Sequence, residues 1–177
     1  MAETTQTFIT FAYGSNMLSS RILERCGHAT ELGMAELRGY ELKWHKHSKD
    51  GSGKCDVVQI RDVAKVVYGV LYKIPVDEKP ALDAAEGLGN GYEAKDVEVM
   101  FKGATRMASL YYATKIHPSL KPYTWYKAFV VKGAEEHNLP GSYIEWLKAT
   151  DAIEDPNRKR HSSNWQPLTP DRNKPRQ

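Results

Sequence analysis

The chain has 177 residues, a net charge of +3, 41% hydrophobic residues and 27% charged residues. This composition is typical of a soluble globular protein with one core, and it excludes collagen-like, disordered and multi-pass membrane classes. Two cysteines are too few for a disulfide framework, which favours a reducing compartment. Residues 1–7 show no signal-peptide pattern, so we expect a cytoplasmic protein with no membrane partner.

The basic excess belongs to the C-terminal segment. Residues 156–177 hold six basic residues and one acidic residue, which leaves 19 basic and 21 acidic residues in the rest of the chain. We therefore expect no basic face that binds nucleic acid on the folded body. The segment is also rich in proline and poor in apolar residues. This pattern divides the chain into one domain, 1–152, and a tail, 153–177, for which a solvated state is favoured over docking through Trp165.

Hydrophobic alternation and turn residues predict more strands than helices. Ser142 and Glu145 match a capping box at the start of the last helix. Because strands dominate the first two thirds and helices the last third, we predict an α+β fold. The elements are expected in this order: strand 8–13, helix 18–26, strands 40–47, 57–60 and 65–74, helix 77–85, strands 92–101 and 105–114, and helices 123–137 and 142–149.

The first candidate site is Tyr13-Gly14-Ser15-Asn16, between a predicted strand and a predicted helix. Glycine permits a tight turn and close backbone approach, and the amide groups at such a turn can bind a carboxylate. An ordinary turn with Ser15 or Asn16 as the helix cap also explains these residues. On the tetrapeptide alone, the ordinary turn is the favoured interpretation.

The second candidate is Glu86, directly after a predicted helix and before several glycines. A carboxylate there faces the negative end of the helix dipole, which is unfavourable for stability. If apolar neighbours also shield it, its pKa should rise, which suits proton transfer near neutral pH. An exposed loop glutamate is an equally good interpretation of its position.

Tyrosine is unusually abundant, with ten tyrosines against four phenylalanines. Tyr13, Tyr92 and Tyr126 lie beside the features described above or in a predicted helix. Most tyrosines on a sheet are structural, and one whose hydroxyl points into a pocket is the less common case.

Two further motifs lack required residues. The segment Asp50–Cys55 resembles a phosphate loop, but it lacks the first glycine and the final Ser or Thr, so we interpret it as a flexible connection. His45 and His47 have the spacing to share a metal, but no third ligand is evident, and we predict no metal site. Cys26 is not convincingly paired with a histidine base, which disfavours cysteine nucleophile chemistry.

Taken together, these residues resemble the γ-glutamylcyclotransferases. The resemblance covers residues 8–150 and rests on the order and spacing of several short motifs. The motifs are Phe11-Ala12-Tyr13-Gly14-Ser15-Asn16, the strand around Val66–Tyr72, Leu82-Asp83, Glu86-Gly87, Tyr92, Tyr126-Lys127, Gly133-Ala134 and Leu139-Pro140.

The resemblance implies a small mixed β-barrel flanked by helices. It also implies a reaction without a cofactor, in which a γ-glutamyl amide releases its amine while the glutamyl part closes to pyroglutamate. Glu86 matches the catalytic glutamate of the family, and Tyr13, Gly14, Ser15 and Asn16 match the loop that binds the substrate carboxylate. Tyr92 and Tyr126 match pocket tyrosines.

Other functions remain open at this point, and the sequence does not indicate an oligomeric state. One alternative is a deglutamylating cyclotransferase that acts on a modified amine or a carrier protein. Another is a silent module that binds a small molecule in the same pocket. A third is an adaptor that binds nucleic acid or an acidic partner through the basic tail.

Overall fold

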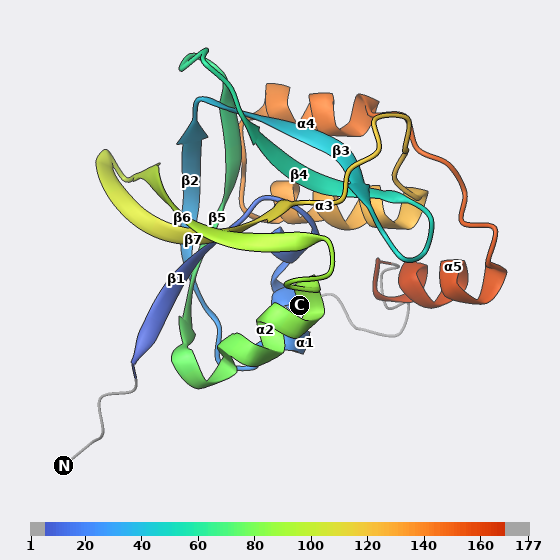
Figure 1. Ribbon diagram of the computed structural model, residues 1–177, viewed down its shortest axis with the longest axis horizontal. Coiled ribbons are helices and arrows are strands. Elements are labelled where there is room, and N and C mark those ends of the chain that lie inside the picture. Colours follow the sequence, from blue (N-terminus) through green and yellow to red (C-terminus); the bar gives the residue numbers. More distant parts are fainter. Residues whose placement is uncertain (1–5, 169–177) are drawn as a thin grey trace, which may run out of the picture.

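The computed structural model describes residues 6–168, so the basic residues 172, 174 and 176 lie outside the described part. Within that part, five strands close a barrel in the order β1-β5-β2-β6-β7 (Figure 1). Neighbouring strands are antiparallel except β1 and β7, which pair in parallel at Thr10 and Ser109. The strands are β1 Thr7–Ala12, β2 Thr30–Arg38, β5 Val66–Pro75, β6 Tyr92–Phe101 and β7 Ala104–Ala113. The predicted α+β class and mixed barrel are confirmed.

A separate two-stranded ribbon is formed by β3, Tyr40–His47, and β4, Gly53–Gln59. In Figure 1 this ribbon extends from the barrel toward the C-terminal helices. The interpretation of 50–55 as a flexible connection was wrong for its second half, because residues 53–55 belong to β4 and Cys55 is buried. Strand β2 was not predicted; the mostly polar residues of its first half obscure its alternation.

The helices flank the barrel. The N-terminal group contains η1 (Ser15–Met17), α1 (Ser19–Arg25), η2 (Val76–Glu78) and α2 (Lys79–Glu86). The C-terminal group contains α3 (Thr124–Glu136) and α4 (Gly141–Ala149). The predicted capping box was wrong, because the residue before α4 is Pro140 and no side chain caps the helix.

Helix α3 packs closely against the loop that follows β1. A Cβ atom at Gly133 would lie 2.7 Å from the Cβ of Met17 and 2.6 Å from the backbone nitrogen of Leu18. Only a residue without a side chain permits this approach. Gly133 therefore sets the distance between α3 and the loop that carries the first candidate motif.

Residues 155–168 are held against the domain. Helix α5, Arg158–Trp165, is followed by the short turn η3, Gln166–Leu168, whose Leu168 is buried. Trp165 packs partly buried against the core. The expectation of a solvated tail was wrong for this part, and docking through Trp165 is the arrangement found. The boundary between 152 and 153 stays a prediction.

Asp155 is the polar anchor of this segment. Its buried carboxylate accepts two hydrogen bonds of 2.6 Å from the guanidinium of Arg160 and one of 3.0 Å from the indole of Trp125. The bonds from Arg160 are the main reason that the pKa of Asp155 lies well below its usual range. The carboxylate form therefore stabilises the folded chain.

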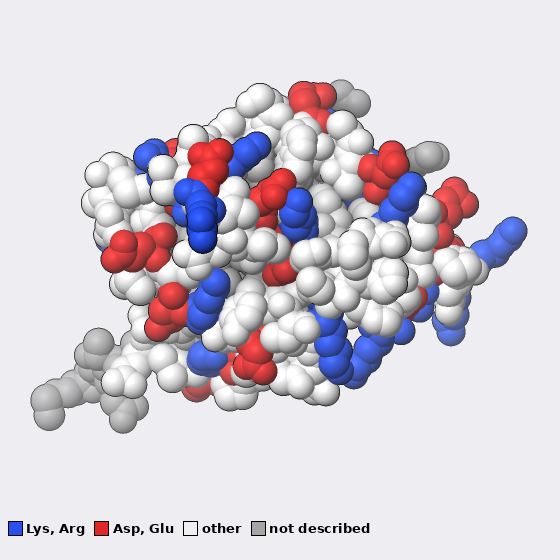
Figure 2. Space-filling model, turned by 45° about the horizontal axis from the view of Figure 1, so that its top comes forward, with Lys and Arg blue, Asp and Glu red and all other residues white. Residues whose placement is uncertain are grey.

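Basic and acidic side chains are interspersed over the face drawn in Figure 2. Among residues 6–168, no helix is long and apolar enough to cross a membrane.

We predict that Asp155→Asn lowers the melting temperature near pH 7 by roughly 5 °C, since it removes the charge from a buried pair. The folded-state pKa is lowered, so the stabilisation is complete above the unfolded value of about 4 and declines as the pH falls below it. The difference between the melting temperatures of the two proteins should be constant from pH 7 to about 5 and should narrow progressively from about pH 4 toward pH 3. The control is Asp151→Asn, whose exposed pair with Lys121 contributes little. An equal difference at every pH would contradict this account.

Candidate active site

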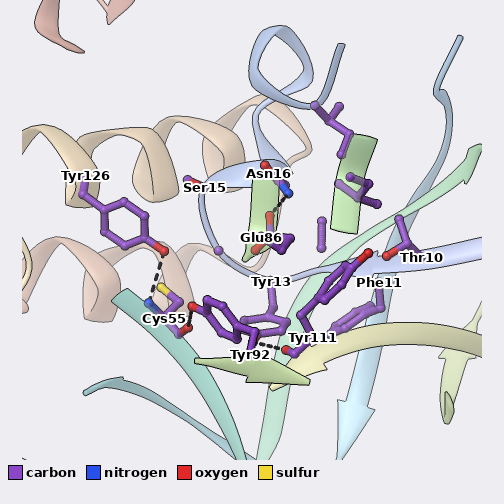
Figure 3. Close-up of a pocket in the computed structure, with 14 residues that line it drawn as sticks. Thr10, Phe11, Tyr13, Ser15, Asn16, Cys55, Glu86, Tyr92, Tyr111 and Tyr126 are labelled. Atoms are coloured by element: carbon purple, nitrogen blue, oxygen red, sulfur yellow. Dashed lines mark hydrogen bonds between the residues drawn. The ribbon is translucent and has the colours of Figure 1, made fainter. Parts of the chain in front are cut away.

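A small pocket lies where the end of β1 meets α1, α2, α3 and β4 (Figure 3). It encloses about 50 Å³, and the structure brings together in it every residue predicted for the site. Its lining consists of Thr10, Phe11, Ala12, Tyr13, Gly14, Ser15, Asn16, Ile22, Cys55, Leu82, Glu86, Tyr92, Tyr111 and Tyr126. The roles of these residues in binding and catalysis stay predictions.

The loop 13–16 is fixed from three sides. The hydroxyl of Tyr13 donates to the backbone oxygen of Tyr111, and the Ser15 hydroxyl accepts a 3.0 Å hydrogen bond from Arg21 Nε. A Cβ atom at Gly14 would lie 3.2 Å from both the Tyr126 hydroxyl and the Cβ of Cys55. The close backbone approach expected at Gly14 is therefore present, and the loop cannot shift without moving its neighbours.

Glu86 is the last residue of α2, and a specific capping structure ends the helix after it. Gly87 adopts the left-handed conformation with φ 73°. Its N–H donates to Ala84, and the N–H of Leu88 donates to Asp83, at 3.1 and 2.9 Å. These two bonds form the Schellman motif that commonly ends helices at glycine. The geometry fixes the backbone of Glu86 and directs its side chain toward the loop 13–16 (Figure 3).

The carboxylate of Glu86 is held by two groups. Its Oε1 atom accepts hydrogen bonds from Asn16 Nδ2 at 2.5 Å and from Arg25 Nη1 at 2.9 Å. The same Arg25 nitrogen donates to Asn16 Oδ1, which closes a three-residue network. The side chains of Arg25 and Glu86 are 19% and 18% exposed, so this ion pair is only partly screened by water. The guanidinium of Arg25 and the amide of Asn16 therefore fix the orientation of the Glu86 carboxylate in the pocket.

Sequence reasoning missed Arg25. Arginine in the last turn of a helix such as α1 is ordinarily explained by the helix dipole. Nothing in the local pattern connects Arg25 to a glutamate 61 positions later. Only the packing of α1 beside α2 reveals the pair.

Two predicted pocket tyrosines bind the two backbone polar groups of Cys55. The Tyr126 hydroxyl accepts from the backbone N–H of Cys55 at 3.1 Å, and the Tyr92 hydroxyl donates to the Cys55 carbonyl at 2.5 Å. Burial raises the pKa of both tyrosines well above the usual value, so they remain neutral phenols. Burial also raises the pKa of the Cys55 thiol to about 12, which makes it a poor nucleophile.

Tyr111 was not singled out from the sequence. Its hydroxyl donates to Asp83 Oδ1 at 2.5 Å, and its backbone oxygen accepts from Tyr13. The excess of tyrosine was the available signal, but it did not distinguish Tyr111 from the others. Asp83 also pairs with Lys79 and does not line the pocket, while Glu93 is exposed on β6. Glu86 is therefore the carboxylate that lines the pocket.

His45, one of the two histidines considered as metal ligands, lies against a carboxylate of the chain. His45 Nε2 lies 2.7 Å from a carboxylate oxygen of Asp56. Within residues 6–168, no three His, Cys, Asp or Glu side chains gather closely enough to hold a metal ion.

The chain is similar to known proteins over most of its length. The family model of the AIG2-like family matches residues 66–147. The mouse and human proteins named gamma-glutamylcyclotransferase are each 29% identical over 154 residues, which is 84% and 82% of this chain and 81% and 80% of theirs. A solved structure named gamma-glutamyl cyclotransferase is 30% identical, has a TM-score of 0.78, and is matched over 84% of this chain and 90% of its own.

The barrel and these matches define the class, which is an enzyme of the transferase type. The chain belongs to the γ-glutamylcyclotransferase family.

We predict that Arg25→Met lowers the kcat of the cyclotransferase roughly 10- to 100-fold, the equivalent of one charge-assisted hydrogen bond of about 1.5–3 kcal/mol. The reason is that Glu86 loses the cation that orients its carboxylate. Steady-state kinetics test this, with Arg38→Met as the control because Arg38 forms an exposed pair with Glu36. If Arg25→Met retains the wild-type kcat while folding normally, the ion pair has no part in turnover.

Proposed function

We propose that this enzyme cyclises the glutamyl part of a γ-glutamyl amide to pyroglutamate (5-oxoproline) and releases the amine. The observation that carries the proposal is the position of Glu86. Glu86 provides the carboxylate that lines the pocket, and its side chain is held by Asn16 and Arg25 so that it faces the loop 13–16. The names of the relatives support the same reaction class.

The reaction requires no nucleophile from the enzyme. The α-amine of the substrate, in its neutral form, attacks the γ-carbonyl carbon, and a new C–N bond closes the five-membered ring. Glu86 accepts the proton that the attacking nitrogen loses. It then returns a proton to the leaving nitrogen as the original amide C–N bond breaks. The products are pyroglutamate and the free amine, and Glu86 ends as the carboxylate with which it began.

The loop 13–16 is proposed to hold the α-carboxylate of the substrate. The N–H groups of Met17 and Leu18 already donate hydrogen bonds to the backbone oxygens of Gly14 and Ser15, at 3.1 and 3.3 Å. The preceding N–H groups, at the start of η1, are the ones placed to bind an anion. Fixing this carboxylate folds the α-amine toward the γ-carbonyl, which is the contribution of proximity and orientation.

The tyrosine walls complete the proposed site. Tyr13, Tyr92 and Tyr126 are buried, neutral and hydrogen-bonded to backbone groups. They surround the reacting atoms with polarisable rings but offer no competing base. In such a water-poor pocket, intramolecular attack by the amine is favoured over hydrolysis.

We predict that Glu86→Gln reduces pyroglutamate formation by about 10²- to 10⁴-fold, because glutamine cannot carry a proton between the two nitrogens. The purified proteins should be incubated with a panel of γ-glutamyl amides and glutathione, and pyroglutamate measured by mass spectrometry. Glu93→Gln, an exposed neighbour on β6, is the matched control and should behave as the wild type.

Two outcomes would redirect the proposal. If Glu86→Gln retains turnover, Glu86 is not the proton carrier. If the wild-type protein binds members of the panel but releases no pyroglutamate, the substrate is a γ-glutamyl group on a carrier, or the pocket is a silent binding module.

A further inference from the structure

The backbone carbonyl of Met17 is held by two side chains from distant parts of the fold. The hydroxyl of Tyr72, on β5, donates to this oxygen at 2.7 Å, and His137 Nε2 lies 2.7 Å from it. Because a carbonyl oxygen only accepts, His137 Nε2 is a protonated ring nitrogen. Met17 and Tyr72 are buried and the side chain of His137 is 3% exposed, so water competes little for these bonds.

These bonds lie where η1 ends and α1 begins. Leu18, between the two, is extended with ψ 119°. The carbonyl of Leu18 is taken up by α1, because the N–H groups of Arg21 and Ile22 both donate to it. The carbonyl of Met17, one residue earlier, is taken up by the two side chains instead. A buried backbone carbonyl needs a partner, and at this junction side chains supply it.

The end of α3 also binds an N–H group of the same junction. His137 directly follows Glu136, the last residue of α3. Glu136 Oε2 accepts a 3.0 Å hydrogen bond from the N–H of Ser19, the first residue of α1. The C-terminal end of α3 therefore binds a carbonyl on one side of Leu18 and an N–H on the other. The junction cannot rotate without breaking hydrogen bonds to α3.

Fixing the Met17 carbonyl also fixes the turn that forms part of the pocket. This carbonyl and the N–H of Leu18 belong to one planar peptide unit, so the orientation of one sets the orientation of the other. The Leu18 N–H closes η1 by donating to the Ser15 carbonyl at 3.3 Å. Asn16 lies inside that turn, and its side chain binds the carboxylate of Glu86. The orientation of the peptide unit therefore affects how the proposed proton carrier is held.

Tyr72 and His137 stand outside the pocket, since neither is among the residues that line it. They can influence the reaction only through the turn that they hold. Burial raises the pKa of Tyr72 to about 12, so its hydroxyl remains a neutral donor near neutral pH. His137 follows α3, the helix whose Gly133 packs against Met17. His137 therefore connects the C-terminal helices to the site by a hydrogen bond as well as by packing.

We propose that His137 is a positioning residue for the active site. By holding the Met17 carbonyl, it keeps η1 in the conformation in which Asn16 reaches the pocket carboxylate and the first N–H groups of the turn face the substrate. This inference rests on the proposed function, because it uses the role assigned there to the loop 13–16. His137 touches neither the substrate nor the reacting atoms and acts through Met17.

Two substitutions that each imitate one ring nitrogen provide the test. The amide nitrogen of glutamine can take the place of His137 Nε2, whereas that of asparagine corresponds to Nδ1, which faces Glu31 at 3.1 Å. We expect His137→Asn to raise the KM for a γ-glutamyl amide about 3- to 10-fold and to lower kcat/KM about 10- to 30-fold, as for a buried carbonyl that loses a donor. His137→Gln restores the donor and should stay within about threefold of the wild type. A smaller folded fraction would lower the apparent kcat and leave the KM unchanged.

Glu31→Gln is the matched control. It changes the partner of His137 Nδ1 and leaves the bond from Nε2 to Met17 in place. Both KM and kcat should therefore remain near the wild-type values. If Glu31→Gln raises the KM as much as His137→Asn does, the histidine acts through its ion pair and the inference is overturned. Equal KM values for His137→Gln and His137→Asn would overturn it as well.

Amide hydrogen exchange, measured by NMR, separates this inference from the proposed function because it needs no substrate. The N–H of Leu18, which closes η1, should exchange about 10-fold faster in His137→Asn than in the wild type or in His137→Gln. The N–H groups of the hairpin of β6 and β7 should keep their wild-type rates.

The possible outcomes distinguish the two proposals. If the wild-type protein forms no pyroglutamate but exchange at Leu18 depends on the donor at position 137, the proposed function fails and the hold of His137 on the turn stands. If pyroglutamate forms but neither the KM nor exchange at Leu18 responds to His137→Asn, the proposed function stands and the inference fails. If exchange accelerates equally in the hairpin, the substitution loosens the whole fold and the inference is overturned.

Discussion

The ion pair between Arg25 and Glu86 connects the two helices on which the site depends. Arg25 is the last residue of α1 and Glu86 is the last residue of α2. Arg25 Nη1 lies 2.9 Å from Glu86 Oε1, and both side chains form hydrogen bonds with Asn16. Glu86 alone would be poorly placed, since a carboxylate at the C-terminal end of a helix faces the negative end of its dipole, and the cation of Arg25 offsets this. This pairing holds the carboxylate of Glu86 beside the loop 13–16, which is proposed to bind substrate. The Schellman ending at Gly87 fixes the end of α2 that carries Glu86, and the close approach of α3 at Gly133 fixes the turn that follows Asn16.

The barrel positions the remaining parts of the site, which are the loop 13–16 and the pocket tyrosines. Strand β1 delivers Tyr13 and the loop 13–16 to the end of the barrel, and β6 and β7 deliver Tyr92 and Tyr111. Their hydroxyl groups bind backbone atoms or Asp83, so the pocket wall is a hydrogen-bonded framework of neutral groups. Such a wall leaves Glu86 as the group proposed to carry out the acid–base chemistry.

Much of the fold followed from local sequence signals, because they are strong where one face of an element is buried. The hairpin of β6 and β7 was predicted almost to the residue, and the motif Tyr13–Asn16 and Glu86 were recognised as candidates. Their convergence in one pocket depends on barrel closure, which no short motif encodes. Strand β2 and the docked α5 were missed because their sequences are largely polar. Arg25 was missed because its partner is distant in sequence and near only in the folded chain.

The central claim is that one fixed carboxylate transfers protons while the substrate attacks itself. The most direct measurement is to run the reaction of a γ-glutamyl amide in water enriched in oxygen-18 and analyse the products by mass spectrometry. Intramolecular attack by the amine incorporates no oxygen from water, so the account predicts unlabelled pyroglutamate and no glutamate. Glutamate that carries oxygen-18 in its γ-carboxylate would mean that Glu86 activates water instead, and would contradict the account.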